Sequence, residues 1–265
     1  MAIHPTAIVD KAASLGDVEI GPYAIVGPDV TLKDGVVVDS HAVVYGPTTI
    51  GEGCHIHAFA CLGGDPQDRR YEGERTSLEI GSHNIFREYV TVSRGTATGA
   101  GVTRIADHNL FMAHAHVGHD GDVGSHCVLA NSVALAGHVV VEDHAVLGGL
   151  SGVHQNGRIG RYAMLGAGGM AAQDVPPFTI AQGDRARLYG LNIIGLRRGG
   201  MPDSEIQALR LAYRDLFGKG VPLRIAVDRV RETQQDSESV GIILDFIEAS
   251  RRGVCRASGP DAGGD

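Results

Sequence analysis

The chain lacks tryptophan, and aromatic residues of any kind make up only 5% of its 265 residues. No apolar run approaches the roughly 18 residues of a membrane-spanning helix. Positive charge is also scarce: 23 Lys and Arg stand against 31 Asp and Glu, a formal net charge of −8, which argues against a nucleic-acid-binding protein. The start, "MAIHPTAIVD", has neither the basic region nor the apolar core of a signal peptide. We therefore expect a cytoplasmic protein with no membrane span and no nucleic-acid partner.

Cysteine is rare as well. Cys54, Cys61, Cys127 and Cys255 are too few for a disulfide framework, and their spacing does not match a zinc knuckle. Glycine, in contrast, occurs 38 times. A chain with so many glycines and so few aromatics must fill a narrow core with small aliphatic side chains.

Aliphatic residues recur every six positions along most of the chain. One run steps from Ile20 to Leu62, and a second runs without a break from Ile105 to Ala171, with ten of its twelve core positions Leu, Ile or Val. A period of six fits neither an amphipathic helix nor an alternating strand, but it is typical of a hexapeptide β-solenoid. A generic glycine-rich β protein would not keep its phase over twelve hexads.

The period also predicts the domain organisation. Two polar, glycine-rich excursions, residues 63–79 and 93–104, interrupt it, and loops on a rigid scaffold often carry function. From about residue 203 the apolar residues follow helical spacing, in three segments separated by "GKG" and "QQDSES". We expect a β-helix over 1–190, a helical domain over 191–253 and a disordered tail over 254–265.

Residues eighteen apart should lie on neighbouring coils, roughly 4.8 Å apart. On one face this spacing stacks His119 on Gly137 and Asp120 on His138. The polar and glycine residues that it gathers there are His116, His119, Asp120, Gly137, His138, His154, Gln155 and Asn156. On another face it stacks His108, His126 and His144, which we interpret as a solvated histidine ladder without a metal.

The first group has the chemistry for acyl transfer. A neutral imidazole at His119 can accept a proton from a hydroxyl, and Asp120 can orient the ring. Gly137 leaves a backbone N–H open for a developing oxyanion. No serine or cysteine stands in the group as a nucleophile, so transfer from a thioester to an alcohol needs no covalent enzyme intermediate, metal or cofactor.

The chain resembles the UDP-N-acetylglucosamine 3-O-acyltransferase family of lipid A biosynthesis. Six motifs in order carry the resemblance: "HPTAIVD", "GDPQDRRYEGE", "AHAHVGHD", "LAGHVVVEDHAVLGGLSGVHQ", "AQDVPPFTIAQG" and "GLNIIGLRR". The resemblance implies an all-β left-handed parallel β-helix with a small helical domain, assembled as a homotrimer. It also implies transfer of an R-3-hydroxyacyl chain from acyl carrier protein to the 3-hydroxyl of UDP-N-acetylglucosamine.

The same resemblance implies roles for individual residues. His119 matches the general base, Asp120 the acid beside it and Gly137 the oxyanion donor. The expected sugar loop, which reaches into a neighbouring subunit's groove, carries Gln67, Asp68 and Tyr71. The expected groove lining and nucleotide contacts are His116, His138, His154, Gln155, Asn192 and Arg198. Ala167 and Arg185 are expected to limit the length of the acyl chain, Ala167 because the long-chain relatives have glycine there.

Some residues depart from the family pattern. Ile194 stands where an acid is expected, Gly199 where a second arginine is expected, and Ser93 where a histidine is expected. These departures leave open a 3-amino variant of N-acetylglucosamine as the acceptor. The segment 184–224, with eight Arg or Lys against four Asp or Glu, is a candidate docking surface for acyl carrier protein or simply a solvated face.

Three other functions fit the sequence less well. A γ-type carbonic anhydrase would use His114 and His119 as zinc ligands, but its third ligand falls at Leu78. A purely structural solenoid gives no reason for the histidine group or the excursions. The related N-acyltransferase of the same pathway has an additional amino-terminal domain, whereas hexads here begin at Ile3.

Overall fold

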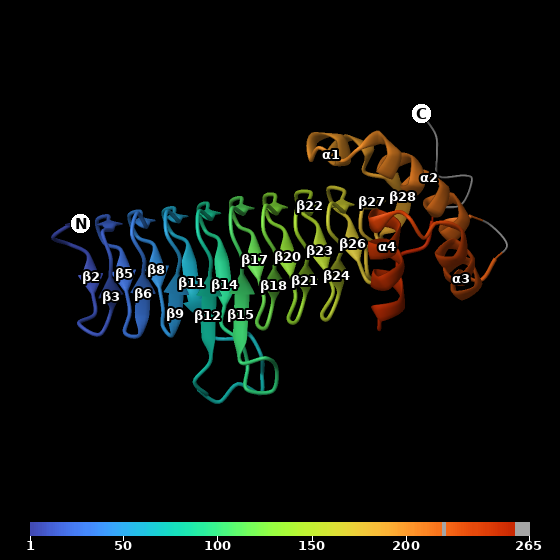
Figure 1. Cartoon of the computed structure of the whole chain (residues 1–265). Helices are drawn as coiled ribbons and strands as arrows, with labels where there is room; N and C mark the ends of the chain where they lie inside the picture. The colour runs from blue at the N-terminus through green and yellow to red at the C-terminus, as the bar shows by residue number, and fades with distance from the viewer. Residues whose placement is uncertain (219–220, 258–265) are drawn as a thin grey trace.

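The computed structural model describes residues 1–218 and 221–257. Figure 1 shows a long stack of coils that begins at the amino terminus and ends in a group of helices. Nearly every coil consists of three short strands, and strands of successive coils pair in parallel. The described residues thereby form three long sheets, the three sides of a parallel β-helix.

The sheets take every third strand along most of the chain. The first consists of β1 (Ala2–Ile3), β4 (Glu19–Ile20), β7 (Val37–Val38), β10 (His55–Ile56), β13 (Ile85–Phe86), β16 (Leu110–Phe111), β19 (Val128–Leu129), β22 (Val146–Leu147), β25 (Met164–Leu165), β27 (Thr179–Gln182) and β28 (Arg187–Leu191). The second consists of β2 (Ile8–Val9), β5 (Ile25–Val26), β8 (Val43–Val44), β11 (Cys61–Gly64), β14 (Thr91–Ser93), β17 (His116–Val117), β20 (Ala134–Leu135), β23 (Gly152–Val153) and β26 (Met170–Ala171). The third consists of β3 (Ser14–Leu15), β6 (Val30–Leu32), β9 (Thr48–Ile50), β12 (Ser77–Ile80), β15 (Val102–Ile105), β18 (Asp122–Val123), β21 (Val140–Val141) and β24 (Arg158–Ile159).

The register confirms the eighteen-residue coil. Val117 pairs with Leu135, and Leu135 with Val153, each eighteen residues along. From Ile20 on, the third residue after most core aliphatics takes a left-handed backbone conformation, as at Asp120 (φ 56°) and His138 (φ 59°). This conformation turns the chain at a corner, and it is several-fold enriched in Asp, Asn and His among residues with a side chain. The hexad therefore explains both the narrow core and the many polar residues at the corners.

The core is as thin as the sequence predicts. From Ile20 on, the aliphatic positions are buried along the stack, and the two phenylalanines in phase with them, Phe86 and Phe111, are fully buried and stack with ring centroids 4.8 Å apart. The expected histidine ladder is confirmed. His126 stacks on His108 at 5.1 Å and on His144 at 4.8 Å.

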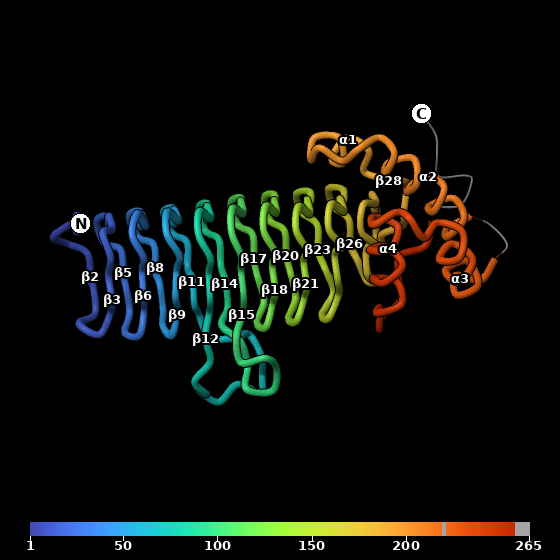
Figure 2. Tube along the Cα trace, viewed as in Figure 1, coloured from blue at the N-terminus to red at the C-terminus, as the bar shows by residue number. Residues whose placement is uncertain are grey.

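The two excursions leave the stack at neighbouring coils and are seen below β12 and β15 in Figure 2. They are shorter than the sequence indicates: the loop between β11 and β12 covers 65–76, and the loop between β14 and β15 covers 94–101. Residues at the loop bases continue the sheets, because Leu78 pairs with Thr103 and Ile80 with Ile105. The two loops also touch, since the Arg94 side chain donates to the Tyr71 hydroxyl over 3.1 Å.

In the residues that the structure describes, four helices follow the coils: α1 (Ile193–Arg198), α2 (Asp203–Phe217), α3 (Leu223–Thr233) and α4 (Glu238–Ala249). The helical periodicity from residue 203 predicts the last three and misses the short α1, which is too brief to show a period. They pack around a second apolar core that contains Leu196, Leu209 and Ile243. No helix among the described residues is long and apolar enough to cross a membrane.

The predicted disordered tail, 254–265, is wrong for its first residues. Val254 and Cys255 are buried, and the Cys255 N–H donates to the Asp174 carbonyl over 2.8 Å. Leu188 pairs with Ala257 in the same way. These residues supply backbone partners to the last coil, which would otherwise end in unpaired groups. The rest of the predicted tail, 258–265, lies outside the described residues.

Candidate active site

His119 and Asp120 lie side by side just after β17. The His119 Nδ1 is 2.8 Å from Asp120 Oδ2, and both residues are only 8% exposed. The left-handed turn at Asp120 brings its carboxylate back toward the preceding side chain. Because an ionised carboxylate only accepts hydrogen bonds, it selects the tautomer with the proton on Nδ1 and leaves the Nε2 lone pair of His119 available.

The loop 94–101 encloses the Asp120 carboxylate. The Thr96 N–H and hydroxyl donate to it, the hydroxyl over 2.7 Å, and the Ala100 N–H donates over 2.9 Å. Burial acts to raise the pKa of the Asp120 carboxyl, but hydrogen bonds from His119 and Thr96 outweigh it, and the pKa lies below its ordinary value. Asp120 is therefore ionised at neutral pH and held in one orientation.

Gly137 lies directly against the His119 ring, one coil further along. A Cβ at position 137 would be 2.5 Å from both Cε1 and Nε2 of His119, so the ring occupies the space that any side chain there would need. The Gly137 N–H has no hydrogen-bond partner within the described part of the chain. A free lone pair and a free N–H donor thus lie next to each other, as an attack on a carbonyl requires.

Further histidines surround this pair. The ring of His138 meets that of His119 edge-on with centroids 5.0 Å apart, and its Nε2 is 3.9 Å from Asp120 Oδ2. His116 forms a 2.8 Å hydrogen bond with the Thr91 hydroxyl. Burial, followed by the proximity of His119, lowers the pKa of His116, so this ring is neutral at neutral pH. The grouping of these side chains on one face follows the eighteen-residue spacing.

His154 and Gln155 lie one coil beyond Gly137 and are exposed. His154 Nδ1 is 3.2 Å from the Gln155 carbonyl, which also accepts a 3.0 Å hydrogen bond from Arg252. Asn156, at the next corner, is exposed too. These side chains border the site and leave it open to a ligand.

The loop 65–76 brings Asp68 to the same site. Its carboxylate accepts hydrogen bonds from Arg70, including one of 2.8 Å from Nη2. Hydrogen bonds from the Arg70 side chain and backbone lower the pKa of Asp68 to about 2, and His119 contributes to the lowering. The expected role of this loop in a neighbouring subunit's groove stays a prediction.

The Arg94 side chain holds the loop 65–76 in place. This buried side chain bonds the Gly63 carbonyl and the Asp65 carboxylate, and it donates to the Tyr71 hydroxyl over 3.1 Å. Tyr71 is half-buried in this network, whereas Gln67 is exposed on the loop. Sequence reasoning missed Arg94 and Thr96, both in the second excursion. The signal available in the sequence was an arginine and a threonine within a glycine-rich excursion.

The predicted nucleotide contacts, Asn192 and Arg198, lie at α1, and the Asn192 side chain caps this helix. Asn192 is 7% exposed, its side-chain Oδ1 accepts from the Gly195 N–H at the start of α1, and its Nδ2 donates to the Tyr162 carbonyl over 2.9 Å. Arg198, in contrast, is exposed in the last turn of α1. Gly199 packs against the Tyr162 ring, where a Cβ would come within 2.5 Å of Cε1.

The two residues expected to limit chain length are exposed. Ala167 follows the core residue Leu165 by two positions, and its backbone N would be 2.5 Å from a Cβ at Gly148. Arg185 lies in the turn between β27 and β28. Neither contacts the His119 group in the described residues, so a role for them concerns a distant part of a bound ligand.

The structure does not bring together the zinc ligands of the alternative carbonic anhydrase function. His114 stacks on Tyr89 with ring centroids 4.9 Å apart, at a different corner of the coil from His119. The group that lies around His119 instead contains Asp120 and His138.

Comparisons with known proteins agree with this geometry. The family model described as "Udp N-acetylglucosamine O-acyltransferase; Domain 2" matches residues 174–255, and the bacterial transferase hexapeptide model matches residues 29–64. Curated acyl-[acyl-carrier-protein]–UDP-N-acetylglucosamine O-acyltransferases from Stenotrophomonas maltophilia and Thermodesulfovibrio yellowstonii are 44% and 45% identical to the chain. Each alignment covers 96% of this chain, with 97% and 99% of the respective relatives.

A solved structure of LpxA from Acinetobacter baumannii has a TM-score of 0.94 and 42% identity, and it covers 97% of this chain and all of its own. The UDP-N-acetylglucosamine O-acyltransferase of Moraxella catarrhalis gives a TM-score of 0.93 at 41% identity, with the same coverage of both chains. Relatives this similar along almost the whole length share its coils, its two excursions and its helices. The chain therefore belongs to the UDP-N-acetylglucosamine O-acyltransferase family of hexapeptide-repeat enzymes.

Proposed function

We propose that this protein catalyses the first step of lipid A biosynthesis, the transfer of an R-3-hydroxyacyl chain from acyl carrier protein to the 3-hydroxyl of UDP-N-acetylglucosamine. The observation that carries the proposal is the placement of the His119 ring between the Asp120 carboxylate and the Gly137 N–H. The proposed substrates are those in the names of the curated relatives, and the proposed reaction is that of the family to which the chain belongs.

In the proposed mechanism, His119 is the general base. Its Nε2 accepts the proton of the sugar 3-hydroxyl while that oxygen attacks the thioester carbonyl. The carbonyl oxygen becomes an oxyanion, which the Gly137 N–H stabilises. Collapse of the tetrahedral intermediate breaks the C–S bond, and the protonated His119 returns its proton to the departing thiolate of the carrier protein.

Asp120 acts on this mechanism through His119. When the ring gains a proton, the adjacent carboxylate stabilises the imidazolium that forms. The three donors from Thr96 and Ala100 keep Asp120 in place during the cycle. We assign Asp68, on its well-anchored loop, to the binding of the sugar beside the base.

The remaining partners are part of the proposal. Exposed arginines near the helical end favour docking of an acidic carrier protein there. They are Arg185, Arg187, Arg197, Arg198, Arg210 and Arg214. A homotrimer would supply a second wall to the open site around His154 and Gln155. We expect the reaction to occur in the cytoplasm.

The test is a direct assay of the purified full-length chain. It is supplied with 3-hydroxyacyl carrier protein and, in parallel, with UDP-N-acetylglucosamine or its 3-amino analogue, and the products are identified by mass spectrometry. Transfer to the 3-hydroxyl of the first supports the proposal. Exclusive transfer to the amine would assign the chain to the other acceptor, and no transfer to either would refute acyl transfer to these sugars.

A further inference from the structure

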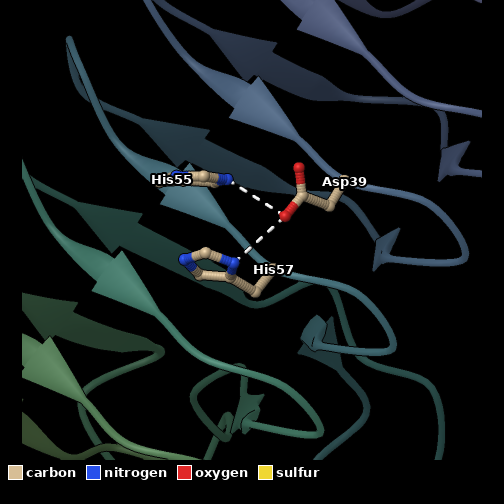
Figure 3. Close-up of side chains that lie close together, drawn as sticks. All are labelled: Asp39, His55 and His57. Atoms are coloured by element: carbon tan, nitrogen blue, oxygen red, sulfur yellow. Dashed lines mark hydrogen bonds and ion pairs between the residues drawn. The ribbon is translucent and has the colours of Figure 1, made fainter.

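A second group of titratable side chains lies on the amino-terminal part of the stack, away from the His119 site (Figure 3). His55 and His57 flank the core residue Ile56 on β10, so both imidazoles lie on the outer side of the coil. Asp39 precedes His57 by eighteen residues and occupies the same hexad position one coil earlier. Asp39 Oδ2 is 3.0 Å from His55 Nε2 and 3.1 Å from His57 Nδ1.

We propose that Asp39, His55 and His57 bind a divalent transition-metal ion of the zinc class. Two imidazole nitrogens and a carboxylate oxygen are a common protein ligand set for such ions. Zinc holds nitrogen and oxygen ligands at about 2.0–2.2 Å, which places the ligand atoms of a tetrahedral site roughly 3.3 Å apart. The two measured separations need to widen by only a few tenths of an ångström.

The surroundings favour a cation. The three side chains are 22–38% exposed, so an ion can enter and a water molecule can complete its coordination. The nearest charges on the following coil, Arg87 and Glu88, bond each other through two hydrogen bonds of 3.1 Å. Their charges offset, and Asp39 leaves the cluster with a net negative charge.

The two histidine rings also lie together on the outside of the coil. The two rings stack with centroids 3.9 Å apart, which keeps both nitrogens directed at the same carboxylate oxygen.

The other potential ligand group among the described residues is a poorer metal site. There the Asp120 carboxylate already accepts hydrogen bonds from His119, Thr96 and Ala100. Within the described part of the chain, the Asp39 carboxylate is bonded only by the two histidines that would become its fellow ligands. No metal is expected from the sequence, and the histidine groups that the eighteen-residue spacing predicts do not include Asp39, His55 and His57.

The competing explanation is a metal-free cluster in which both histidines donate a hydrogen bond to Asp39. Zinc titration of the full-length protein, stripped of metal by a chelator, separates the two. The titration is followed by calorimetry and by competition with a chromogenic chelator. The variants are His57→Asn and Asp39→Asn, with His126→Asn as the matched control, because His126 is a surface histidine in a stacked ladder without a carboxylate.

We expect the wild type and His126→Asn to bind one zinc ion per chain at this cluster. His57→Asn and Asp39→Asn should weaken that binding by more than about 100-fold, since even outer-shell partners of metal ligands contribute about 10–100-fold. Zinc should also raise the melting temperature of the wild type and of His126→Asn but not of the two cluster variants. Absence of zinc binding by the wild type, or unchanged binding by His57→Asn, would overturn the proposal. Loss of all zinc in His119→Ala would assign the metal to the other group and overturn it equally.

Discussion

The substitution Gly137→Ala tests the geometry of the candidate active site directly. The new Cβ would be 2.5 Å from Cε1 and Nε2 of His119, whereas ordinary contacts of such atoms begin at 3.4 Å. The ring must therefore retreat by nearly an ångström. It is buried and held by the 2.8 Å bond to Asp120, so it cannot move without weakening that bond.

The expected effects follow from this displacement. Overpacking of this kind destabilises a protein by about 1–3 kcal/mol. In a chain of this size, each kcal/mol lowers the melting temperature by about 2–4 °C. Turnover should fall by at least about 10²-fold, the typical effect of disturbing one oxyanion-hole donor, because the base and the Gly137 N–H no longer face the same point.

Two controls separate a local clash from general damage. Gly149 occupies the same hexad position two hexads further on, and a Cβ there would first meet the Asn131 carbonyl at an ordinary 3.4 Å. Gly149→Ala should therefore melt like the wild type. In a His119→Ala background the clashing ring is gone, so adding Gly137→Ala should lower the melting temperature much less than it does in the wild type.

The assays are thermal melting and acyl transfer from a 3-hydroxyacyl carrier protein. The reasoning is refuted if Gly137→Ala melts and turns over like the wild type, because the His119 ring would then not lie where the structure has it. Equal destabilisation with and without His119 would show that the methyl group clashes with something else.

Four further predictions concern the base, the assembly, the loop and the acyl chain. His119→Ala should cut turnover by about 10²–10⁴-fold or more while leaving the coils folded by circular dichroism; more than a tenth of the wild-type activity would exclude the general-base role. Light scattering should give a homotrimer, and a stable, active monomer would contradict this. Arg70→Gln should raise the pKa of Asp68 from about 2 toward its ordinary value near ~3.9. Because folding depresses this pKa, the contribution of the Arg70–Asp68 pair to stability is present above about pH 4 and is lost as the pH falls through about 2. NMR titration of the Asp68 carboxyl measures the shift, and an unchanged pKa in Arg70→Gln would remove Arg70 as the cause. Ala167→Gly should shift donor preference toward longer 3-hydroxyacyl chains, since each additional buried methylene contributes ~0.8 kcal/mol; competition between donors measures it, and an unchanged length profile would show that the limit lies elsewhere.

The sequence predicts the coil well because its physical cause is local and repeated. One aliphatic side chain per hexad fills a thin core, and the next coil repeats the contact eighteen residues later, so the phase can be followed from Ile105 to Ala171. The same arithmetic predicts that His119 stacks on Gly137, as the structure confirms. It fails where the period stops, at the short helix α1 and at Val254 and Cys255, which pack on the last coil.

The sequence by itself therefore determined the solenoid, the stacking of His119 on Gly137 and the family motifs. Only the tertiary structure decided how Asp120 is held, because Thr96 and Ala100 reach it from a loop that has no period. It likewise decided that Arg94 anchors the loop of Asp68 and that Asn192 caps a helix. A repeat fixes each residue through its neighbours on the next coil, whereas the excursions are fixed by individual hydrogen bonds, and no periodicity in the sequence records them.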